Sequence, residues 1–197
     1  YRLAKGFERM NVLFFITRII TFFGSSLRCF WEFVVCRIFK LPIEDIRCFK
    51  ISEMCSHIEH EITEKAGQSF LLCALPFALN FCLGSCFLAY SSYYVFYAGV
   101  VNFNSVFFLI IGISLYSNLF PSVENALSLK DNIYSGEGKN LFVKIILAPF
   151  TALMLFGAYL EKYSLSVLAS IAAAIAFPFI TDPIFYVISR IMMELKS

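Results

Sequence analysis

Residues 69–89 read SFLLCALPFALNFCLGSCFLA and contain no charged side chain. The hydrocarbon core of a bilayer is about 30 Å thick, and an α-helix needs about 20 mostly apolar residues to cross it. The uncharged region extends well beyond this stretch, because no Asp, Glu, Lys or Arg occurs from Ala66 to Val123. A soluble domain needs a polar shell that such residues cannot supply. The stretch therefore predicts a helix that crosses a membrane.

The composition of the whole chain agrees with a membrane protein. Of the 197 residues, 59% are hydrophobic and 15% are charged, whereas an average soluble domain has roughly 25% charged residues. The net charge of +2 is small and the basic residues are scattered, which excludes a nucleic-acid-binding surface. The cysteines are odd in number and several lie in apolar runs, so no disulfide framework is expected. The principal partner we expect is the lipid bilayer.

The apolar stretches predict one all-α integral membrane domain over residues 1–197, with about four clear transmembrane helices. These helices are predicted at residues 69–89, 100–120, 141–160 and 164–189. Each stretch is long enough to cross the hydrocarbon core. Between the first two, residues 90–97 are rich in tyrosine, and we interpret them as an interfacial connector whose rings lie at headgroup depth.

The first part of the chain is less regular. Charged residues interrupt the apolar residues 11–39, and the sequence Gly24-Ser25-Ser26 at their middle predicts a break. We therefore expect a re-entrant or broken helical segment at 11–39, followed by a polar segment at 40–65. Within the polar segment, an imperfect alternation over residues 42–51 predicts a short interfacial strand.

The charged segments predict which parts of the chain share a face of the membrane. With four crossings, residues 40–65, residues 121–144 and the C-terminus lie on one side. Most Lys and Arg residues belong to that side. The positive-inside rule makes it the cytoplasmic side or its equivalent in another compartment.

Ionisable groups at membrane depth are costly, so they mark candidate sites. Arg28 and Glu32 lie four residues apart, which places them on one face of a helix, where they can form an ion pair. Because buried charges are generally paired, the simplest interpretation is that the two neutralise each other inside a helix bundle.

Cys55, His57 and His60 form a second group, and they are ligand types that suit zinc. Their spacing is not diagnostic, because several glutamates surround them and a solvated charged segment explains the composition equally well. A structural zinc site normally needs four protein ligands, and the fourth would come from elsewhere, for example Cys48. We therefore favour no metal, with these three residues as the alternative.

A third group lies where the second clear span ends. Asn118 and Asn125 are poor zinc ligands, and helix termination explains them best. Ser122 is placed to cap a short helix that follows. Asn80, in the preceding span, can bond either a carbonyl freed by the nearby proline or an adjacent helix. No GxSxG elbow is present and no histidine lies inside a span, which disfavours serine-type hydrolysis.

Three segments carry a resemblance when they are taken in order. They are GSSLRCFWE at 24–32 with VVCRIF at 34–39, HIEHE at 57–61 leading to PFALN at 76–80, and SNLFPS at 117–122 with Asn125. Together they resemble a family of small prokaryotic membrane proteins related to site-2-type intramembrane zinc metalloproteases. That family has an HExxH helix, a GYVxHE segment with a PFxxN helix, and a HAFPS sequence at the corresponding places.

The resemblance implies a site that has lost its ligands. The positions that it marks as vestigial are Arg28, Cys29, Glu32, His60, Asn118 and Asn125. Arg28 and Glu32 stand where the family has its two HExxH histidines, and Cys29 stands where it has the glutamate that activates water. Asn118 and Asn125 replace a later His and Asp, so only His60 remains. Because hydrolysis needs about three protein ligands on zinc, the resemblance implies no catalytic residue and no cofactor.

The sequence therefore predicts a non-catalytic polytopic membrane protein, either a pseudo-metalloprotease scaffold or a subunit of a membrane protein complex. Two alternatives stay open. One is an active zinc-dependent intramembrane peptidase with a rebuilt site, and the other is a transporter or channel subunit that uses Asp182. The small-residue run 170–176 allows close helix approach, and we predict that Ala172 and Ala176 form a helix-packing interface with other membrane protein subunits.

Overall fold

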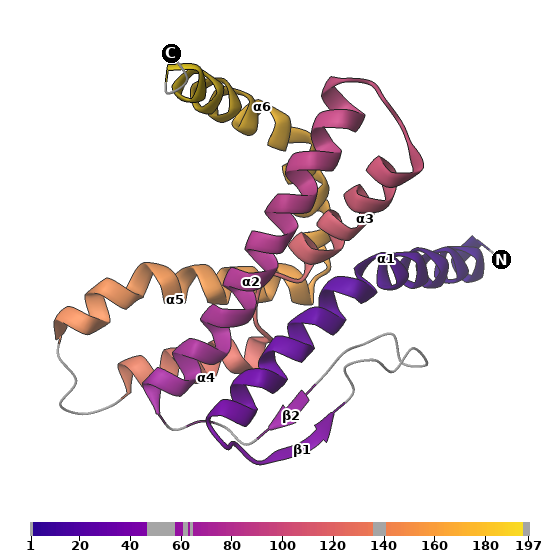
Figure 1. Ribbon diagram of the computed structural model, residues 1–197. Coiled ribbons are helices and arrows are strands. Elements are labelled where there is room, and N and C mark those ends of the chain that lie inside the picture. Colours follow the sequence, from indigo (N-terminus) through magenta and orange to yellow (C-terminus); the bar gives the residue numbers. More distant parts are fainter. Residues whose placement is uncertain (1, 47–57, 61–62, 64, 136–140, 195–197) are drawn as a thin grey trace.

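The chain is mostly helical (Figure 1). The computed structural model describes residues 2–46, 58–60, 63, 65–135 and 141–194. Its elements are α1 (Arg2–Ile38), β1 (Ile43–Ile46), β2 (Ile58–His60), α2 (Ala66–Ser92) with a π-helical turn η1 (Tyr93–Tyr97), α3 (Phe103–Ser117), α4 (Val123–Tyr134), α5 (Leu141–Lys162) and α6 (Leu165–Glu194). The helical class that the sequence predicts is confirmed.

Three stretches of helix are long and apolar enough to cross a membrane. They are Ala66–Tyr97, Leu141–Lys162 and Leu165–Asp182. The stretch predicted at 100–120 forms α3, which is apolar but shorter, because the helix begins at Phe103 and ends at Ser117, and a bend at Phe120 follows. Within the described residues, three helices therefore have the length and composition of a membrane span.

The break predicted at Gly24 is wrong, because α1 is helical without interruption from Arg2 to Ile38. The Ser25 hydroxyl donates to the Phe22 carbonyl of the same helix, 3.0 Å away. Gly24 instead lies where α1 crosses α3: its N–H donates to Ser114 Oγ at 2.8 Å, and a Cβ would overlap the Ser114 carbonyl. An unbroken helix does not turn back on itself, so the expected re-entrant or broken segment is replaced by one long helix.

Residues 90–97 are not a connector, because the helix continues through them. Helix α2 runs to Ser92 and η1 extends it to Tyr97. The chain reverses only after that point, at Gly99, whose φ of 65° lies in the left-handed region. Tyrosine has no intrinsic tendency to stop a helix, so composition alone misplaced this boundary.

A short antiparallel pair of strands packs beside the end of α1. Ile43 lies opposite His60, and Ile46 lies opposite Ile58. The strand predicted at 42–51 is confirmed for Ile43–Ile46, while residues 47–51 lie outside the described residues. Ile58 is buried and packs against Cys29, which fixes the pair to α1.

The core lies around the first half of α2. Its consecutive residues Leu72 and Cys73 belong to two different hydrophobic clusters. Leu72 packs with Val35 and Cys36 of α1, whereas Cys73 joins a cluster from α4 and α5 made of Leu129, Ile133 and Met154. Figure 1 shows α3 beside the far half of α2 and α5 running across α2 rather than alongside it. The first half of α2 thus supports two separate groups of helices.

Candidate functional site: a buried arginine bridge

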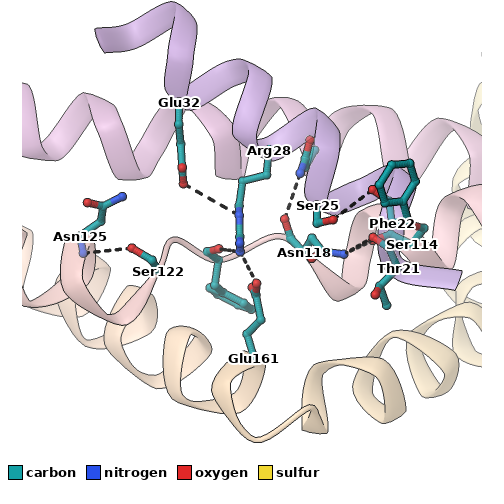
Figure 2. Close-up of polar contacts among 12 residues, drawn as sticks. Thr21, Phe22, Ser25, Arg28, Glu32, Ser114, Asn118, Ser122, Asn125 and Glu161 are labelled. Atoms are coloured by element: carbon teal, nitrogen blue, oxygen red, sulfur yellow. Dashed lines mark hydrogen bonds and ion pairs between the residues drawn. The ribbon is translucent and has the colours of Figure 1, made fainter. Parts of the chain in front are cut away.

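Arg28 extends from the last third of α1 towards three partners (Figure 2). Its Nη1 donates to the Phe120 carbonyl at 2.8 Å and forms a hydrogen-bonded ion pair with Glu161. Its Nε lies 3.9 Å from Oε1 of Glu32. The side chains of Arg28, Glu32 and Glu161 are only 12%, 8% and 19% exposed. A charged cluster therefore lies inside the protein.

The partners of Arg28 come from segments that are far apart in the sequence. Glu32 is one helical turn further along α1, as the four-residue spacing predicts. Phe120 belongs to the link between α3 and α4, and Glu161 is the second-last residue of α5. The arginine therefore joins α1, the α3–α4 link and the end of α5 at one point.

The electrostatics keep this arginine charged. Burial alone would lower the pKa of Arg28, but the charges of Glu161 and Glu32 and the hydrogen bond to Glu161 outweigh it, and the pKa is raised. A guanidinium has several donors and no acceptor, so it suits a carboxylate and a carbonyl at the same time. Arg28 can therefore hold hydrogen-bond acceptors in place, but it does not exchange a proton with them.

Phe120 is held at both its backbone and its ring. Its carbonyl accepts from Arg28, while its ring lies 5.6 Å from the ring of Phe77 on α2. The ring also fills the space beside Gly157 of α5, where a Cβ would overlap it. Close packing of α5 against the α3–α4 link therefore depends on glycine at position 157, which has no side chain.

Asn118 is buried in a polar contact among three helices. Its Nδ2 donates to the Thr21 carbonyl of α1 at 3.0 Å and to the Ser114 carbonyl of α3 at 2.9 Å. Its own carbonyl accepts from Asn80 Nδ2 of α2 at 2.9 Å. Of the two roles expected for Asn80, the bond to an adjacent helix is the one observed. Asn118 thus ends α3 and also ties it to α1 and α2.

Asn125 lies at the start of α4. Its N–H donates to Ser122 Oγ at 3.2 Å, so the predicted cap and the short helix that follows are confirmed. Its carbonyl accepts from the Cys73 thiol of α2, at 3.6 Å. Asn118 and Asn125 are therefore both engaged by backbone and side-chain partners of neighbouring helices.

Cys29 and His60, the two other vestigial positions, lie near the strand pair. Cys29 is buried and disulfide-bonded, which the odd number of cysteines did not indicate. His60 is part of β2. The remaining zinc candidates, Cys55 and His57, lie outside the described residues. Where the structure does describe the chain, no three His, Cys, Asp or Glu side chains are grouped so as to hold a metal.

The small-residue run of α6 has two different faces. Ser170 and Ala174 are buried, and Ser170 Oγ lies 2.7 Å from Ser117 Oγ of α3. Ala172 and Ala176 are exposed. Packing within the chain therefore uses the first pair, and the predicted contact of Ala172 and Ala176 with another subunit stays a prediction.

Sequence reasoning found Arg28 and Glu32 but missed Glu161. Glu161 directly follows the predicted span 141–160, and with Lys162 it is typical of the polar residues that end such a span. One feature of the sequence could have indicated Glu161: it is a charged residue at the end of an apolar helix, and a charged residue that is buried there needs a partner. No protein-family model, curated protein or solved structure matches this chain. The resemblance to intramembrane metalloproteases therefore rests on the three sequence segments alone.

Proposed function

We propose that this chain is a non-catalytic multi-pass membrane protein that acts as a helical scaffold for another membrane protein. The observation that carries the proposal is the Arg28 bridge. It occupies the positions at which the resemblance would put zinc ligands, and it fills them with a permanent positive charge that repels a metal ion. Its neighbours Asn118 and Asn125 are likewise committed to holding helices together.

The exposed surface supports a membrane environment. No more than 33% of the residues in the apolar windows of the three long helices are buried within the chain. Leu141 and Phe142 at the start of α5 and Phe179 on α6 are more than 70% exposed. Apolar patches of this kind are rare on soluble monomers, so lipid or a partner helix covers them.

The sidedness follows from charge. The strand pair and α4 lie at the end of the molecule where α2 begins (Figure 1), and the described basic residues Lys40, Lys65 and Lys130 belong to this end. By the positive-inside rule, we assign this end to the cytoplasmic side or its equivalent.

The decisive experiment compares metal content with stability. The protein purified in mild detergent should contain far less than one zinc per chain, and a strong chelator should leave its Tm unchanged. An active peptidase would instead hold stoichiometric zinc and lose stability on chelation, because metal binding stabilises the folded state. Zinc that disappears in a Glu32→Gln variant would contradict the proposal directly, because Glu32 would then be a ligand.

The partner surface is tested on α6. The double variant Ala172→Leu, Ala176→Leu should release co-purifying chains, because larger side chains prevent close helix approach. Ala152→Leu is the matched control, since Ala152 is an exposed alanine on α5. An unchanged complex size in both variants would show that the α6 face is not the interface.

A further inference from the structure

The far end of α2 carries a group of exposed tyrosines that the Arg28 bridge does not involve. We call Tyr90, Tyr93, Tyr94 and Tyr97 the tyrosine tip. Their rings touch in a chain, with centroids 4.8 Å apart for Tyr90 and Tyr94, 5.7 Å for Tyr93 and Tyr94, and 5.3 Å for Tyr93 and Tyr97. All four are between 38% and 58% exposed. Rings in contact form one continuous surface rather than separate side chains.

The backbone that carries the last three of these tyrosines is a π-helical turn, η1. In η1 the N–H of Ala98 bonds the Tyr93 carbonyl, and the N–H of Val100 bonds the Tyr94 carbonyl, both at 2.9 Å. This wider turn follows two serines, Ser91 and Ser92, that are fully buried. The small serine side chains are thus buried, and the tyrosines of η1 are exposed. Such π-turns are often associated with functional sites.

The residues that precede and follow the tyrosine tip in the sequence are mostly apolar and uncharged. Across the chain reversal, Val100, Val101 and Phe103 are 44%, 66% and 83% exposed. No charged residue lies between Ala66 and Val123. A surface with exposed apolar groups and hydroxyls but no charge suits neither water alone nor the hydrocarbon core alone.

We propose that the tyrosine tip anchors the α2–α3 hairpin in the headgroup layer of one membrane leaflet. The rings lie among the upper acyl chains, and the hydroxyls donate to lipid ester and phosphate oxygens, as aromatic belts do. Because residues 66–123 carry no charge of their own, we expect their attachment not to depend on anionic lipids or on salt. This inference rests on the proposed membrane location of α2 and adds the surface that sets its depth.

The test places a fluorescent reporter in the tip. The sole tryptophan is removed by Trp31→Phe and a new one is added by Tyr97→Trp, in protein reconstituted into phosphatidylcholine vesicles. Lipids brominated near the glycerol should quench this reporter more strongly than lipids brominated deep in the chains. The quenching should not change when anionic lipid or salt is added. Quenching by aqueous iodide but not by either lipid overturns the inference.

A second measurement keeps the test independent of folding. Replacing Tyr93, Tyr94 and Tyr97 together by serine should increase the labelling of a Val101→Cys variant by an impermeant maleimide, whereas phenylalanine at the same positions should increase it less. Tyr134→Ser, at an exposed tyrosine on α4, is the control and should leave labelling unchanged. Unchanged labelling in the serine variant, or cross-linking of Val101→Cys between copies without lipid quenching, overturns the inference. Resistance to carbonate extraction in either case leaves the proposed function standing.

Discussion

At the scale of single residues, Arg28 shows how a long-range contact escapes sequence reasoning. The pair with Glu32 could be predicted because a helix turns once in about four residues. The contact with Glu161 could not, because 133 positions separate the two residues and only the packing of α5 brings them together. Glu161, the carboxylate nearest to the Arg28 guanidinium, is therefore the partner that no neighbouring residue in the sequence indicates.

The bridge predicts an order of stability among its variants. Arg28→Met should destabilise the protein by about 3–5 kcal/mol, because it removes the guanidinium that forms ion pairs with two buried carboxylates. Glu161→Gln should cost more than Glu32→Gln, since Glu161 is hydrogen-bonded to the guanidinium and Glu32 lies 3.9 Å from it. Unfolding in detergent, followed by circular dichroism, measures each change.

A double variant separates the charge from the packing. Arg28→Met with Glu161→Met should recover part of the loss, because it removes the buried carboxylate that is hydrogen-bonded to Arg28 and replaces the pair by apolar groups. A double variant as unstable as the sum of the single ones would show that the two side chains do not interact.

At the scale of elements, most helices could be predicted and their ends could not. The apolar runs gave α2, α5 and α6 because a membrane-length helix needs little besides apolar residues. The break predicted inside α1 was wrong, because the sequence Gly24-Ser25-Ser26 is typical both of a turn and of a place where two helices cross. Only the position of α3, which no sequence pattern reveals, decides between the two.

The helix crossing at Gly24 predicts a matched pair of substitutions. Gly24→Ala should destabilise the protein by about 1–3 kcal/mol, because the new methyl group forces α1 away from α3. Gly67→Ala, on the first turn of α2, has no heavy atom within 4 Å of the new Cβ. It should stabilise the helix by up to about 1 kcal/mol. Equal effects of the two changes in thermal unfolding would exclude a close crossing at Gly24.

At the scale of the whole molecule, the direction of α5 decides how often the chain crosses the membrane. The sequence predicts four crossings, which put the C-terminus on the same side as residues 40–65. In Figure 1, however, α5 runs across α2, while α6 extends towards the end of α2 that carries η1. If α2, the shorter α3 and α6 make the crossings and α5 does not, the end of α6 at Glu194 lies on the side of the tyrosine tip.

Labelling from the two sides of sealed vesicles distinguishes these topologies. Single cysteines are introduced by Val101→Cys, Ser135→Cys and Ser197→Cys in a background without exposed native thiols. We expect impermeant reagent to reach positions 101 and 197 from one side and position 135 from the other. Labelling of positions 135 and 197 from the same side would restore the four crossings.

Phe120 links the position of α5 to the contacts of Arg28. The same residue offers its carbonyl to Arg28 and seats its ring against the glycine of α5. A force that shifts α5 sideways, from lipid tension or from a bound neighbour, therefore moves one acceptor of a buried cation. A displacement of α5 and the hydrogen bonding of the buried arginine are therefore coupled through Phe120.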